Sequence, residues 1–204
     1  LCRQGELVAA TDRLKEALSL VGDGPSAEVK ARAFQYLGSI GVVSEAYEEA
    51  ETYLEKALDG YAALEHVLGS SQVRLTLGLA ALHRRAYRAA ERHLEKSLGL
   101  AEAMGYRRGE ALALNGLGRL AGAEGDHDRG TVHCEKALGI ARETCDRLTE
   151  AEVLVELAVL MLHQGRTEEA WKRSVLAVEI ARGLGEPALT ARAWLVAGHV
   201  FTEL

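Results

Sequence analysis

Apolar residues recur along this chain at the three- and four-residue intervals that are typical of amphipathic helices. Leu117 and Leu120 follow this spacing in a shorter segment, which predicts a helix over 110–123. A longer apolar stripe that contains Leu54 predicts a second helix over 47–64. The pattern therefore predicts a chain in which shorter and longer helices alternate.

Small residues show that this alternation repeats. Gly38 recurs as Gly78 and Gly118 at a constant interval, and small residues continue the series at Ala158 and Gly198. The register is kept along the chain without a gap, which chance does not produce. Each repeating unit of this length is therefore expected to form a hairpin of two helices.

Glycine inside a helix costs about 1 kcal/mol relative to alanine, so its recurrence needs a reason in the packing. The expected reason is close approach of the paired helix, because that helix has its own column of small residues: Ala50, Ala90, Gly130 and Ala170. Leu54 and Leu94 are expected to fill the space beside this contact.

Residues that favour helix ends lie between the apolar segments. Four glycines are expected at turns or helix ends: Gly105, Gly125, Gly165 and Gly185. Thr149 and Glu152 predict a capping box that opens a first helix. Pro25 and Pro187 lie just before or at the start of first helices, where proline is tolerated.

A first helix that ends in Leu-Gly, followed by a small residue, a large residue and an alanine in the second helix, is the pattern of the tetratricopeptide repeat (TPR) family. The segments 112–118 and 54–58 resemble the longer variant of this repeat, which occurs in kinesin light chains and in bacterial transcriptional regulators. The resemblance implies an all-α fold, a right-handed α-α superhelical solenoid of TPR-like helical hairpins.

The chain departs from the family pattern in two ways. The aromatic residue expected early in the first helix is present as Phe34 and Trp194, but Arg74, Leu114 and Leu154 replace it elsewhere. The proline that often follows the second helix is missing, so this helix is expected to run on. The extension accounts for a period of about 40 residues rather than the usual length of about 34.

The register predicts one TPR-like array over residues 1–204. Its parts are a partial unit at 1–26 that is mainly a second helix, full hairpins at 27–66, 67–106, 107–146 and 147–186, and a terminal first helix at 187–204. Because the chain begins and ends within a unit, we expect it to be part of a longer protein.

Composition supports helices and narrows the function classes. The 204 residues are 48% hydrophobic and only 5% aromatic, a balance that favours packed helices over sheets. The net charge is -6, so no broad basic field is present to attract nucleic acid or an anionic membrane. The chain has no apolar run of about 18 residues and no signal-peptide pattern, so a cytoplasmic location is expected. The three cysteines form no C-x-x-C pair and are expected to be reduced thiols.

Motifs of catalysis and metal binding are missing. The sequence has no phosphate-binding glycine-rich loop, no G-x-S-x-G elbow and no H-E-x-x-H helix. His93 and His133 occupy equivalent positions of adjacent repeats, which places them about 10 Å apart, too far for one shared metal ion. We therefore expect no enzymatic activity, no cofactor and no metal.

The TPR resemblance implies that the first helices line a concave groove. The residues expected to face this groove and to bind a peptide are Arg32, Gln35, Ser39, Leu75, Leu79, Asn115, Arg119, Glu152, Val155, Arg192 and His199. For Leu75, Leu79 and Val155 the alternative is a place in the core between neighbouring hairpins.

Asn115 and Arg119 lie four residues apart and share a helix face. The resemblance places an asparagine at this position in peptide-binding repeats, and the alternative is a solvated polar stripe. The family's clamp of lysines and asparagines for a C-terminal carboxylate is absent, because the matching positions hold Gln35, Ser39, Leu75 and Leu79.

The leading hypothesis is a protein–protein interaction scaffold that binds a peptide or a helix of an unidentified protein in the concave groove. The alternative is a ligand- or peptide-sensing regulatory domain of a larger regulator, such as a transcriptional one. Self-association through the ends of the array is a third hypothesis. The acidic net charge opposes direct binding of RNA, and no membrane partner is expected.

Overall fold

The computed structural model describes residues 2–20 and 27–203, and in this part of the chain every regular element is a helix. The helices are α1 (Cys2–Leu20), α2 (Ala27–Val43), α3 (Tyr47–Ala63), α4 (Val67–His83), α5 (Tyr87–Met104), α6 (Arg107–Ala123), α7 (His127–Glu143), α8 (Arg147–His163), α9 (Thr167–Leu184) and α10 (Pro187–Thr202). The predicted all-α fold of helical hairpins is confirmed.

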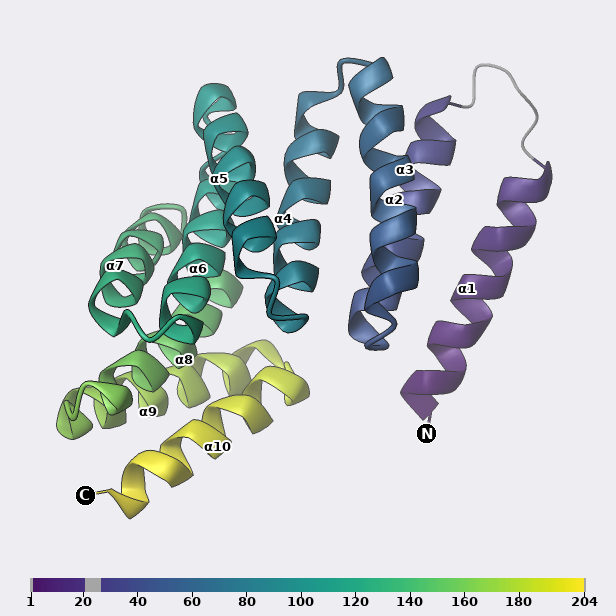
Figure 1. The fold of residues 1–204 in the computed structure, drawn as a ribbon. Helices are drawn as coiled ribbons and strands as arrows, with labels where there is room; N and C mark the ends of the chain where they lie inside the picture. The colour runs from purple at the N-terminus through teal and green to yellow at the C-terminus, as the bar shows by residue number, and fades with distance from the viewer. Residues whose placement is uncertain (1, 21–26, 204) are drawn as a thin grey trace. The chain divides into compact units, whose positions relative to one another are not determined.

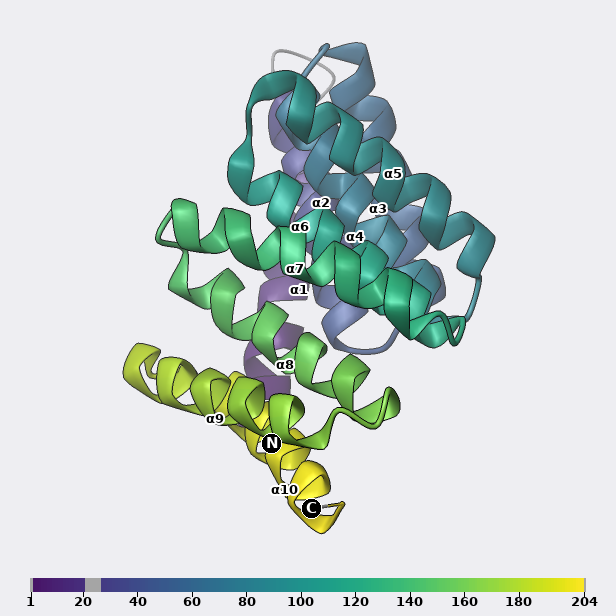
Figure 2. The same ribbon diagram turned by 90° about the vertical axis from the view of Figure 1, so that its left-hand side faces the viewer.

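Two compact units make up the chain, and we call them unit 1 (1–100) and unit 2 (101–204). In unit 1, α2 packs against α3 and α3 against α4 (Figure 1). In unit 2, α6 pairs with α7 and α8 with α9, and α10 packs on α9 (Figure 2). Each helix is thus antiparallel to the next one in its hairpin. No helix among the described residues is long and apolar enough to cross a membrane.

The predicted alternation of shorter and longer helices is wrong, because α2 and α3 have 17 residues each and α6 begins earlier than the apolar pattern predicts. The predicted helix over 110–123 begins at Arg107 instead, which makes α6 17 residues long, the same length as α7. The difference arises because the first turn of α6 is polar and gives no periodic signal. The Glu110 N–H donates to the Tyr106 carbonyl at 3.0 Å, so the backbone closes this turn without apolar side chains.

The predicted capping box at Thr149 is wrong. The N-cap of α8 is Asp146, whose carboxylate accepts hydrogen bonds from the Thr149 N–H at 3.1 Å and from its hydroxyl at 2.8 Å. Thr149 therefore lies inside the first turn as the donor to the cap. Pro187 occupies the first turn of α10 as predicted, whereas Pro25 lies outside the described residues.

All four predicted glycine turns are confirmed. Gly105, Gly125, Gly165 and Gly185 have φ of 66–86°, the left-handed conformation that glycine adopts without a Cβ penalty. The sequence did not reveal that four other connections use the same conformation without glycine. Those residues are Glu45, Glu65, Arg85 and Cys145, with φ of 52–62°.

The glycine column allows the helices of a hairpin to approach closely. A Cβ on Gly78 would lie 2.6 Å from Leu94 Cγ, and one on Gly118 would lie 3.1 Å from the Gly130 carbonyl oxygen. Leu54 and Leu94 are fully buried beside these contacts, as predicted. Gly198 is different, because a Cβ there meets no described atom within 4 Å.

Candidate functional site

A charged cluster joins the first helices of unit 2. Arg119 of α6 has its Nε 3.7 Å from the Glu156 carboxylate of α8, and Arg192 of α10 donates to the same carboxylate at 2.9 Å. Two of the predicted groove residues, Arg119 and Arg192, therefore flank one acidic residue. Each of the three first helices contributes one side chain, so the cluster is a property of the packed unit.

Glu156 was missed by the sequence reasoning. The equivalent positions of the neighbouring repeats hold Gly116 and Val196. Glu156 is therefore the charged residue among these three equivalent positions. That contrast is the signal that could have found it. The side chain is only 14% exposed, which means that its ion pairs are partly shielded from water.

Glu152, one turn before Glu156 on α8, is largely buried in the same cluster. Burial raises the pKa of its carboxyl, Asp146 adds to the rise, and the positive charges of Arg192, Arg119 and Arg108 oppose it. None of the described residues forms a hydrogen bond or an ion pair with this carboxylate. Glu152 is therefore an acceptor that the fold leaves available.

Asn115, which was predicted to face the groove, is buried. It is 8% exposed, and its Oδ1 accepts a hydrogen bond from the Cys134 thiol of α7 at 3.7 Å. Its amide therefore lies between the two helices of its own hairpin. Helix spacing places Asn115 on the same side of α6 as Arg119, but the shorter side chain is covered while the longer one reaches the surface.

Val155 has no exposed surface and is part of the core, which was the alternative to a place in the groove. Leu154 and Leu157 of the same helix are fully buried too. His199 of α10 is exposed. Leu75 and Leu79, in unit 1, are partly exposed.

The polar groove residues predicted in unit 1 bond to other residues of the same unit. Gln35 accepts from the Tyr61 hydroxyl at 2.7 Å and donates to the Gln72 side chain at 3.3 Å. Ser39 donates to the Gln35 carbonyl at 2.9 Å, and Arg32 pairs with Glu28 at 2.6 Å. This surface uses its amides to hold neighbouring helices together, so unit 2 is the better candidate for a binding surface.

Metal-ligand clusters of three or more histidine, cysteine or acidic residues do not occur in the described part of the chain. Burial lowers the pKa of both His93 and His133, and nearby positive charges lower it further. The Nδ1 atoms of these imidazoles are buried and have no hydrogen-bond partner among the described residues.

Residues 109–183 match the tetratricopeptide repeat family, whereas no curated protein matches the sequence. Among solved structures, BtubC from P. vanneervenii has 17% identity and a TM-score of 0.76, over 98% of this chain and 83% of BtubC. A putative kinesin light chain of Podosopora anserina with nearly identical TPR-like repeats has 17% identity and a TM-score of 0.64, over 89% of this chain and 90% of that one.

A third similar structure is the Rap conjugation gene regulator of plasmid pLS20, solved in complex with the Phr* peptide. It has 18% identity and a TM-score of 0.81, over 93% of this chain and 53% of the regulator. At these identities the structures establish a common fold. Residues 109–183 thus carry the tetratricopeptide repeat, and the chain has the TPR-like helical repeat fold of these structures.

Proposed function

We propose that the chain is a protein-interaction scaffold whose unit 2 binds a peptide or a helix of a partner protein on its first-helix face. The observation that carries the proposal is the carboxylate of Glu152, which is largely buried and has no direct partner among the described residues. A buried carboxylate is costly unless it is paired, so a partner that supplies a cation or an N–H group gains from binding here.

The surrounding residues define what such a partner offers. Arg119 and Arg192 already pair with Glu156, which leaves Glu152 as the anionic centre of the cluster. The partly exposed Val159 and Leu162 lie further along α8 and supply apolar contact. A peptide with a lysine or arginine next to an apolar residue fits this combination. The Rap regulator solved with the Phr* peptide supports peptide binding by the fold.

The test is a selection of peptides from a displayed random library on the full chain. We expect the selected peptides to be enriched in lysine and arginine, and Glu152→Gln to weaken their binding about tenfold. Glu168→Gln, which removes an exposed charge from the first turn of α9, is the matched control. Peptides without a basic residue that bind the wild type and the Glu152→Gln variant equally well would contradict the proposal.

A second proposal is that the array senses a ligand or peptide for a larger regulator. The Rap regulator with its bound peptide supports this proposal as well, and this chain spans 53% of that protein. The complete open reading frame tests it. A neighbouring helix-turn-helix or nucleotide-binding domain would support the proposal, and a frame with no further domain would end it.

Self-association through α10 is a separate proposal. This helix exposes Trp194, Leu195 and Phe201, which are 53%, 65% and 68% accessible. Large exposed apolar side chains grouped on one helix are typical of interaction surfaces. Sedimentation velocity over a range of concentrations tests the proposal, and a sedimentation coefficient that stays at the monomer value would exclude it.

A further inference from the structure

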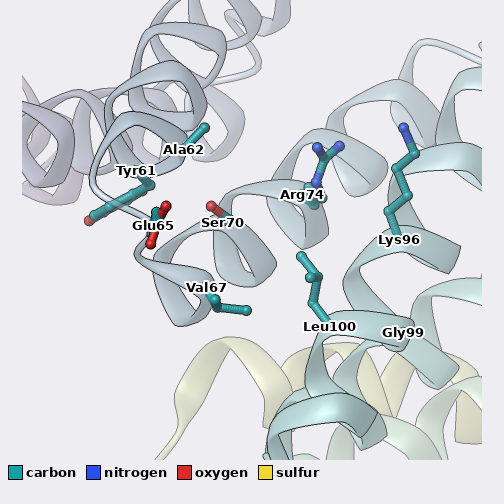
Figure 3. Close-up of a pocket in the computed structure, with 9 residues that line it drawn as sticks. All are labelled: Tyr61, Ala62, Glu65, Val67, Ser70, Arg74, Lys96, Gly99 and Leu100. Carbon is teal, nitrogen blue, oxygen red and sulfur yellow. The ribbon is translucent and has the colours of Figure 1, made fainter.

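A cavity of about 420 Å³ lies in unit 1, between the end of α3, one face of α4 and the second half of α5 (Figure 3). Its size falls in the range of small-molecule sites. The residues that matter for its chemistry are Tyr61, Glu65, Val67, Arg74, Lys96 and Leu100. All of them belong to unit 1, so the cavity is complete within one compact part of the chain.

The cavity uses a different face of α4 from the predicted groove. Val67 and Arg74 lie seven residues apart, which brings both to one side of the helix. Gln72 and Leu79, also seven apart, lie on another side. A ligand in the cavity is therefore distinct from a peptide on the first-helix face.

One end of the cavity is cationic. Arg74 and Lys96 both line the cavity there, and their side chains point in the same direction in Figure 3. None of the carboxylates among the described side chains forms an ion pair with either residue. Their charges also act on His93, whose imidazole pKa is lowered first by burial and then by Arg74, Arg92 and Lys96, with Glu51 opposing.

Comparison with the preceding repeat shows why this pair is unusual. Phe34 and Lys56 stand one repeat before Arg74 and Lys96, and the Lys56 ammonium lies 5.6 Å from the centre of the Phe34 ring. That contact is an attractive cation–π interaction. In the second hairpin, arginine replaces the aromatic ring, so two positive charges share the position. An anion bound between the two cations would attract both of them and thereby offset their mutual repulsion.

Apolar surface continues from the cationic end. Val67 and Leu100 face the cavity between the cations and the side where Tyr61 and Glu65 lie (Figure 3). Val67 is 41% exposed, so part of its surface is free to be covered. Glu65 places a negative charge away from the cations and thereby disfavours a ligand with anionic groups at both ends.

We propose that this cavity binds an organic anion with a single carboxylate or phosphate and an apolar arm. Arg74 and Lys96 bind the anionic group, and Val67 and Leu100 cover the arm. A free small molecule and the C-terminus of a protein chain can both present this chemistry. The proposal is independent of the function proposed for unit 2.

The experiment measures binding of defined probes to the full chain by isothermal titration calorimetry. Hexanoate represents a small molecule, and an acetylated Ala-Leu dipeptide with a free carboxylate represents a chain terminus. Hexanol and the amidated dipeptide lack the anion, and inorganic phosphate lacks the arm. We expect at least one of the two anionic probes to bind, and the three control probes to bind at least about tenfold more weakly.

Two variants test the assignment to this cavity. Arg74→Phe restores the residue type of the preceding repeat, and Lys96→Gln removes the second charge. Each substitution is expected to weaken binding of the anionic probes about tenfold. Lys56→Gln is the matched control and should leave their binding unchanged. Circular dichroism melting of each variant verifies that it is folded.

The outcomes separate the possibilities. Preference for hexanoate indicates a small-molecule ligand, and preference for the dipeptide indicates a chain terminus; both support the site. Absence of binding by both anionic probes, equal binding of hexanol, or equal affinity of wild type and a folded Arg74→Phe variant would overturn the proposal. Loss of peptide binding in Glu152→Gln has no bearing on these results, because the two sites lie in different units.

Discussion

The carboxylate of Glu156 accepts a hydrogen bond from the Arg192 guanidinium at 2.9 Å and thereby links α8 to α10. The same carboxylate lies 3.7 Å from Arg119 of α6. One acidic residue thus connects three first helices of unit 2. Because the side chain is only 14% exposed, its loss should cost more than that of a typical surface ion pair.

We expect Glu156→Gln to lower the free energy of unfolding of unit 2 by about 1–2 kcal/mol. The amide can keep one hydrogen bond but loses the attraction to both arginines. Urea denaturation followed by circular dichroism measures the effect. Glu168→Gln, which changes an exposed residue of α9, should have an effect of less than about 0.5 kcal/mol. Equal stabilities of the two variants would mean that the cluster does not hold the helices.

Stability should depend on pH through Glu152. Burial raises the pKa of its carboxyl above the ordinary value of 4.5, so the folded chain binds this proton more tightly than the unfolded chain does. The contribution of this group to stability is therefore present at low pH and is lost as the pH rises from the ordinary value through the raised one.

Glu152→Gln should remove this dependence. The stability of the variant relative to the wild type is expected to increase across that window and to be larger at about pH 7 than at about pH 4. Urea denaturation at both pH values measures it. A constant difference would show that Glu152 titrates alike in the folded and unfolded chain.

Two glycines of one column should respond oppositely to alanine. In Gly78→Ala, the new Cβ would lie 2.6 Å from Leu94 Cγ and 3.3 Å from the Leu94 backbone nitrogen, so we expect a loss of about 1–3 kcal/mol. In Gly198→Ala, the Cβ meets no described atom within 4 Å, and the higher helix propensity of alanine should add up to about 1 kcal/mol. Thermal unfolding compares the two, and equal shifts would remove the packing explanation for the column.

Two cysteines should differ sharply in reactivity. Cys134 is fully buried and burial raises the pKa of its thiol, whereas Cys145 is exposed. Since the thiolate is the reactive form, iodoacetamide at neutral pH should label Cys145 and leave Cys134 unmodified. Peptide mass mapping reads out both sites. Labelling in urea provides the control, because both thiols should then react. Rapid labelling of Cys134 in the native chain would contradict the prediction and would indicate that α6 and α7 separate easily.

The fold was predictable because its signals are periodic. The regular recurrence of Gly38, Gly78 and Gly118 fixes which helices pair, and apolar spacing shows that they are helices. The start of α6 was harder to predict, because its first turn is polar and is closed by backbone hydrogen bonds alone. The N-cap at Asp146 was missed because Thr149, three residues later, matches the capping-box motif together with Glu152.

The candidate site was predictable only in part. The TPR resemblance put Arg119 and Arg192 on one face, and both lie beside Glu156 in the structure, while their contact with a peptide stays a prediction. Asn115 was misplaced because spacing gives the side of a helix but not how far a neighbouring helix covers it. The cavity beside Arg74 depends on how three helices meet, and no local pattern in the sequence describes that arrangement.

The left-handed residue in the connections has a consequence for how such a chain can change in length. It recurs at every twentieth position from Glu45 to Gly185, with glycine at only half of these positions. Cuts at any two of these turns that are one full repeat apart leave ends of the same backbone shape. Whole hairpins can therefore be duplicated or deleted during evolution, or exchanged by a protein engineer, without a new linker.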